Sequence, residues 1–124
     1  MISFDNFIQT DGVPIYLAII RHIERGAAAG IVKNGDELPS RRMLSALLGV
    51  NPNTIQKAYR ILEEDGLVVS HSGAKSVMTL DDEKISRIRR ELIAADAGDF
   101  IRSMTAMGLS KSETLSLLDR LWKE

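Results

Sequence analysis

The chain has 124 residues, of which 44% are hydrophobic and 27% are charged, values typical of a globular protein with one domain or one domain and an appendage. Its 16 basic and 17 acidic residues give a net charge of −1, and it has no cysteine, which excludes disulfide scaffolds, thiolate catalysis and cysteine-ligated zinc. No apolar run approaches the roughly 18 residues of a membrane span. The first nine residues lack the features of a signal peptide. We therefore expect a cytoplasmic protein without membrane contact.

Charge is distributed unevenly along the chain. The net charge is −2 over residues 1–37, +2 over residues 38–78 and −1 over residues 79–124. The acids of the middle stretch are confined to 63–65, so the rest of it is free of negative charge. A local basic surface of this kind weakly favours nucleic-acid binding.

The N-terminal part predicts an irregular arm over residues 1–12, followed by a helix. Pro14 suits the first turn of that helix, Gly30 ends it, and residues 33–36 read as a turn. Apolar residues recur at helical spacing on one face, and they are Tyr16, Ile19, Ile20, Ile23 and Ala27.

Two short capped helices are predicted next. Ser40 is a good N-cap for the first and Gly49 stops it. Asn51 and Pro52 open the second as an N-cap and N1 pair, and Gly66 closes it. The expected buried face of the first of these helices comprises Met43, Leu44, Leu47 and Leu48.

Two β-prone runs follow, at residues 67–69 and 77–80, and the glycine-containing loop between them predicts a hairpin. A further helix is expected after the acids at 81–83. Gly98 either breaks that helix or is a tolerated interruption. A last helix is predicted from Ser110, which forms a capping-box pattern with the glutamate three residues later.

The helix predicted after Asn51 has two chemically different faces. Successive helical residues are about 100° apart, which places Ile55, Ala58, Tyr59 and Leu62 on one side and Asn53, Gln56, Lys57 and Arg60 on the other. The second group holds two amides and two cations and no acid. Amides pair with adenine edges, and Arg or Lys with guanine edges or phosphates. The order helix, turn, helix, hairpin therefore predicts a winged helix-turn-helix whose second helix enters the major groove.

Each of these features also has a simpler interpretation. A polar helix face is usually solvated surface. Arg41 and Arg42 oppose the dipole of their helix, and they either extend into water or face phosphates. His71 is either a strand surface residue or a wing contact to DNA, and His22 is expected to be an exposed helix residue rather than a metal ligand.

Four ordered strings carry a resemblance to a known family: Pro-Ile-Tyr at 14–16, Leu-Pro-Ser-Arg-Arg-Met-Leu at 38–44, Leu-Gly-Val-Asn-Pro-Asn-Thr-Ile-Gln-Lys-Ala-Tyr at 48–59, and Leu-Glu-Glu-Asp-Gly-Leu at 62–67. Together they resemble the N-terminal DNA-binding domain of GntR-family bacterial repressors. The Asn-Pro-Asn-Thr-Ile-Gln-Lys-Ala-Tyr part of the third string, at 51–59, and the short tail resemble the YtrA subfamily in particular. The resemblance covers residues 12–80, and the tail more loosely.

The resemblance implies roles for individual residues. Arg42 matches the arginine of the family's Leu-Pro-Ser-x-Arg motif, which contacts DNA, and Arg41 replaces a frequent glutamate. Gly73 and Lys75 match the wing, although Lys75 and Val77 replace a second glycine and an aromatic residue. The complete predicted DNA-contacting set is Arg41, Arg42, Asn53, Thr54, Gln56, Lys57, Arg60, Gly73 and Lys75.

The subfamily resemblance also implies that the tail is a pair of helices used for dimerisation. We therefore expect a DNA-binding domain over residues 1–80 and a dimerisation tail over residues 81–124. An apolar set of this size on two helices needs a further surface to pack on. The predicted dimerisation residues are Ile88, Leu92, Phe100, Ile101, Met104, Leu115, Leu118 and Trp122.

The sequence thus predicts a mainly helical protein with a small β-hairpin, acting as a homodimeric, sequence-specific repressor on double-stranded operator DNA. By analogy with the subfamily, the regulated operon is of the transporter type. We expect no cofactor and no metal site, and a small effector stays possible. The alternative is a winged-helix module that binds proteins rather than DNA. An enzyme is not expected, because the sequence shows no nucleophile–base pair, phosphate loop or paired carboxylates.

Overall fold

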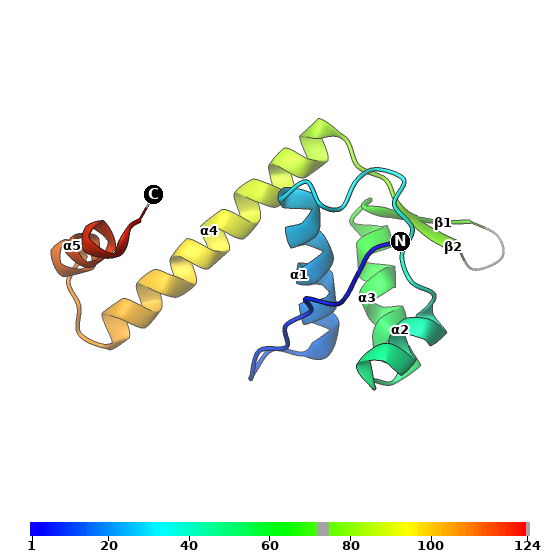
Figure 1. Ribbon diagram of the computed structural model, residues 1–124, viewed down its shortest axis with the longest axis horizontal. Coiled ribbons are helices and arrows are strands. Elements are labelled where there is room, and N and C mark those ends of the chain that lie inside the picture. Colours follow the sequence, from blue (N-terminus) through cyan, green and yellow to red (C-terminus); the bar gives the residue numbers. More distant parts are fainter. Residues whose placement is uncertain (72–74, 124) are drawn as a thin grey trace. The chain divides into compact units, whose positions relative to one another are not determined.

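The computed structural model describes residues 1–71 and 75–123, and it divides into two compact units, Met1–Arg89 and Arg90–Glu124. The described residues form five helices and one antiparallel hairpin (Figure 1), which confirms the mainly helical fold with a small β-hairpin. The division falls after Arg89, inside a helix, whereas the sequence placed it after Leu80.

The first unit is built on three helices: α1 (Ile15–Ala28), α2 (Arg41–Leu48) and α3 (Pro52–Glu64). Both α1 and α2 pack against α3. The predicted apolar face of α1 is correct from Ile19 to Ala27, while Tyr16 at its start is half-buried. The largest fully buried side chains of this core are Ile19, Ile23, Leu44, Ile55, Tyr59, Leu62, Leu67, Met78 and Ile88.

The predicted caps fix the ends of α2 and α3. Ser40 Oγ accepts a hydrogen bond from the Met43 amide at 3.1 Å, and Asn51 Oδ1 accepts one from the Asn53 amide at 2.8 Å. Gly49 ends α2 in the left-handed region at φ 67°, a conformation that glycine adopts without steric cost. These local signals set the sharp turn between the two helices.

The buried face predicted for α2 is only partly correct. Leu44 is fully buried and Leu48 is half-buried, but Met43 is 49% exposed and Leu47 is 61% exposed. An eight-residue helix packed against one neighbour covers a single line of side chains, so the wider face predicted for it was wrong.

The hairpin consists of β1 (Val68–His71) and β2 (Lys75–Met78), paired in the register Val68 to Met78. The segment before α2 adds to its edge: the Leu38 amide donates to the Ser76 carbonyl at 2.9 Å, and the Met78 amide donates to the carbonyl of Asp36 at 2.8 Å. The wing is therefore joined to the α1–α2 connection. Gly73 lies outside the described residues.

The start of α4 (Asp82–Ala106) belongs to the first unit. Lys84 Nζ donates to the carbonyls of Gly66 at 2.7 Å and Thr79 at 3.2 Å. Ile88 is 2% exposed. Its surface is already covered within the chain, so it is not available for the predicted dimer contact. These contacts explain why the division falls later than the apolar pattern suggested.

The second unit contains the rest of α4 and α5 (Lys111–Leu121). α4 continues through Gly98 without a break. The predicted capping box is present: Ser110 Oγ accepts from the Glu113 amide at 3.1 Å, and a Glu113 carboxylate oxygen accepts from the Ser110 amide at 3.0 Å, contacts that lower the pKa of Glu113. In the part of the chain that the structure describes, no helix has the length and apolarity needed to cross a membrane.

Two helical glycines in different surroundings give a test of this packing. A Cβ at Gly26 would lie 2.5 Å from Val32 Cγ2, whereas one at Gly98 would meet nothing closer than the end of the Arg102 side chain at 3.5 Å. We expect Gly26→Ala to lower the free energy of unfolding by about 1–3 kcal/mol through overpacking. Gly98→Ala should raise it by about 0.5–1 kcal/mol through helix propensity. Urea unfolding of both variants checks this, and a neutral Gly26→Ala would contradict the close packing.

Candidate nucleic-acid interface

The two faces of α3 are separated as the sequence predicted. Ile55, Ala58, Tyr59 and Leu62 are each 0% exposed. The opposite face is exposed at Asn53, Gln56, Lys57 and Arg60. Thr54, beside this face, is half-buried. Glu64 continues this face at the end of α3 and pairs with Arg60 at 3.8 Å, so the absence of acids holds only for its first three turns.

Tyr59 fixes α3 to the segment before α2. Its hydroxyl donates to the Pro39 carbonyl at 2.7 Å, and burial raises the pKa of Tyr59 well above its ordinary value, with the charge of Arg41 acting in the opposite direction. The Arg41 guanidinium lies 5.3 Å from the centre of the Tyr59 ring, an attractive cation–π arrangement. The buried face of α3 is therefore held by a directional bond as well as by apolar packing.

Arg41 is also tied to the wing through Glu63. Its guanidinium lies 3.7 Å from the Glu63 carboxylate, which accepts a hydrogen bond from Ser70 Oγ on β1. Ser70 Oγ lies 3.2 Å from Ser76 Oγ on β2. Sequence reasoning missed Glu63 as the partner, although a cation opposing the dipole of its own helix is a signal that such an acceptor is near.

Besides Arg41, three predicted DNA contacts have partners within the chain. Lys57 Nζ lies 4.0 Å from the centre of the Tyr16 ring on α1. Lys75 Nζ lies 3.9 Å from a Glu37 carboxylate oxygen, and Arg60 pairs with Glu64 as described. Ion pairs this exposed contribute about 0–1 kcal/mol, so Lys75 and Arg60 can exchange their carboxylate partners for phosphates at little cost.

The sequence also singled out Arg42, His71 and His22, and these three residues differ in exposure and in contacts. Arg42 is exposed in the first turn of α2, and His71 is exposed on β1. His22 is half-buried rather than exposed, because its Nε2 lies 2.8 Å from the Ser3 carbonyl oxygen and its ring packs on Phe4. Over residues 1–71 and 75–123, no group of His, Asp or Glu side chains has the arrangement of a metal site.

Helix α2, a glycine turn, helix α3 and a following hairpin together define a winged helix-turn-helix of the DNA-binding class. Residues 15–76 match the model of the bacterial regulatory proteins of the gntR family. The HTH-type transcriptional repressor YtrA of Bacillus subtilis is 36% identical over 94 residues, covering 68% of this chain and 72% of YtrA. The chain therefore belongs to the GntR family of transcriptional regulators.

Solved structures agree with this assignment. A GntR family transcriptional regulator from Listeria monocytogenes superposes with a TM-score of 0.77 at 30% identity, covering 92% of this chain and all of the other. The S. agalactiae protein BusR, solved in complex with its busAB-promotor DNA, has a TM-score of 0.53 at 19% identity, covering 94% of this chain and 60% of BusR. The likeness to BusR shows the fold alone.

The Tyr59 bond can be tested by removing one hydroxyl. Tyr59→Phe leaves the buried Pro39 carbonyl without its donor, which we expect to lower the free energy of unfolding by about 1–3 kcal/mol. Because burial raises the pKa of the folded Tyr59, the unfolded chain ionises first and stability falls as the pH rises above about 10. The loss between neutral pH and about pH 11 should be smaller in Tyr59→Phe. Equal losses in urea unfolding would show that Tyr59 is not responsible.

Proposed function

We propose that this chain is a homodimeric, sequence-specific repressor that inserts α3 into the major groove of operator DNA. The observation that carries the proposal is α3 itself, which is capped at Asn51 and buried along one whole face. Its other face presents Asn53 and Gln56, two exposed amides able to pair with adenine edges. The name of YtrA as a repressor supports this action. The transporter-type operon is proposed by analogy with the subfamily alone.

The contacts divide into those that read bases and those that position the protein. Asn53, Thr54 and Gln56 occupy the first turns of α3, where a recognition helix meets base edges. Cations that reach phosphates add affinity without sequence information. We assign this anchoring role to Arg42, Lys57, Arg60 and Lys75.

Arg41 takes a different role in this proposal. Its side chain is only 27% exposed and is engaged by Tyr59 and Glu63. A cation held in this way orients the start of α2 and the wing rather than reaching outward. We therefore reassign Arg41 from DNA contact to positioning.

The second unit supplies the dimer contact in this proposal. An apolar groove of about 400 Å³ lies between α4 and α5, lined by side chains that include Phe100, Leu115 and Leu118. Ile101 is 59% exposed and Trp122 is 71% exposed. Thirty-five residues on two helices cannot cover this surface themselves. A second copy would cover it and place two recognition helices about one DNA turn apart.

Base reading and anchoring are separable by two variants, measured on the DNA sequence that the full chain selects from random duplexes. Gln56→Ala should relax the preference at one position of each half-site, at a cost of about 1–3 kcal/mol there. Arg42→Ala should weaken all sequences evenly and reduce the salt dependence of binding. A changed base preference in Arg42→Ala, or unchanged preference in Gln56→Ala, would contradict the division.

Dimerisation is testable with exposed positions that leave the cores intact. Ile101→Asp and Leu115→Asp place a charge in the groove of the second unit, whereas Ile31→Asp places one at a 77% exposed position of the first unit. We expect the wild type and Ile31→Asp to be dimers at micromolar concentration and the two groove variants to be monomers, because burying an unpaired charge is strongly unfavourable. Light scattering on the full chains decides, and a monomeric wild type would refute the dimer.

A further inference from the structure

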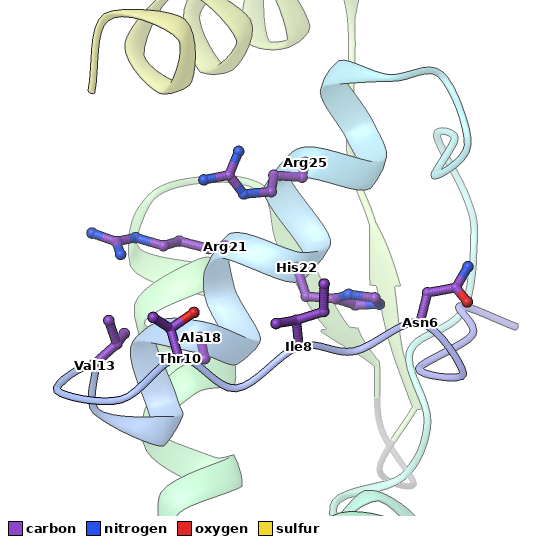
Figure 2. A pocket seen from close by; sticks show the side chains of 8 residues that line it. All are labelled: Asn6, Ile8, Thr10, Val13, Ala18, Arg21, His22 and Arg25. Atoms are coloured by element: carbon purple, nitrogen blue, oxygen red, sulfur yellow. The ribbon is translucent and has the colours of Figure 1, made fainter. Parts of the chain in front are cut away.

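A second hollow lies between the N-terminal arm and α1, apart from the recognition surface (Figure 2). Its volume is about 290 Å³. The arm contributes Asn6, Ile8 and Thr10, and α1 contributes Arg21, His22 and Arg25. The DNA-binding proposal uses none of these residues.

Helix geometry explains why the hollow is remote from α3. Ala18, Arg21, His22 and Arg25 follow the spacing i, i+3, i+4 and i+7, which gathers them on one face of α1. The buried line of Ile19 and its neighbours is on the other face, and α1 packs against α3. A ligand in the hollow would therefore not compete with a base for the same side chains.

The first residues of the arm lie outside the lining, and they are held in place before any ligand arrives. The Ile2 amide donates to the Glu37 carbonyl at 2.8 Å, and His22 Nε2 lies 2.8 Å from the Ser3 carbonyl oxygen. The Phe4 side chain is 5% exposed, and its ring centre is 4.5 Å from that of His22. The arm is thereby anchored at its first residues, and Ile8, which is 77% exposed, passes over the hollow.

The lining holds Arg21 and Arg25 and no acidic side chain. Arg25 is already engaged in another interaction, so Arg21 is the cation that carries the argument. Arg21 is half-buried and has no ion-pair partner among the residues that the structure describes. A guanidinium without an ion-pair partner keeps its donors available for an incoming carboxylate or phosphate. Figure 2 shows Arg21 extending from α1 on the side where the arm carries Thr10, whose hydroxyl is a further donor.

We propose that this hollow binds a small organic anion through a carboxylate or phosphate group. The guanidinium of Arg21 presents a planar fork of donors that matches either group. Thr10 supplies a neutral donor on the same side of the hollow as Arg21, and Ile8 supplies apolar cover. The volume is at the lower end of the roughly 300–1,000 Å³ of small-molecule sites, which suits a sugar monophosphate or a short dicarboxylate rather than a nucleotide.

The test is a titration of the full chain, followed by amide NMR, with inorganic phosphate, glycerol 3-phosphate and succinate as separate probes. We expect saturable shifts confined to residues 6–10 and 18–25 with at least one probe, and the probe that binds tightest identifies the anionic group. Arg21→Gln should weaken this binding about tenfold or more, since hydrogen bonds between charged groups are the strong ones. Arg87→Gln, which removes an exposed arginine of α4 outside the hollow, should leave it unchanged.

Three results would overturn the proposal. One is the absence of saturable shifts with all three probes, and another is equal weakening by Arg21→Gln and Arg87→Gln. The third concerns DNA as an alternative source of phosphate: folded Arg21→Gln should bind the selected DNA as tightly as the wild type when no probe is present. A loss of DNA affinity in that variant would show that Arg21 meets the DNA backbone instead, while DNA recognition itself is judged by Gln56→Ala.

Discussion

The hydrogen bond from the buried Tyr59 hydroxyl to the Pro39 carbonyl is the constraint on which the recognition surface depends. Tyr59 is fully buried in α3, so its position fixes how α3 is rotated and therefore which side chains face outward. The same ring receives Arg41, whose other partner, Glu63, reaches Ser70 on the wing. One buried phenol thus connects the orientation of both helices of the motif with the position of the hairpin.

A second constraint concerns charge. The chain carries a net charge of −1, so it has no strong overall field to attract DNA. Binding must then rest on local contacts, and two of the cations assigned to them lie beside carboxylates, Arg60 beside Glu64 and Lys75 beside Glu37. Because these pairs are exposed, they are weak, and the cations can leave their carboxylates to bind phosphates. Two joined copies would add the avidity that a single winged helix-turn-helix of low net charge lacks.

Sequence reasoning succeeded where the determining signals are local. The caps at Ser40 and Asn51 and the period of α3 depend on residues within one or two turns, and the structure reproduces them. It failed where the outcome depends on packing between distant segments. The sequence around Ile88 does not indicate that the start of α4 packs within the first unit. The sequence around His22 does not indicate that the N-terminal arm covers the His22 ring. Arg41 was assigned to phosphates because its partner is 22 residues away in the sequence.

The central claim is that the exposed face of α3 reads DNA in a sequence-specific way. The most direct measurement selects duplexes from random DNA with the full chain and then follows the affinity for the winning sequence as salt is raised. The account predicts one enriched sequence with two half-sites about 10 base pairs apart and a log–log salt slope of several negative units. A pool without enrichment, bound with an affinity that salt does not change, would contradict it.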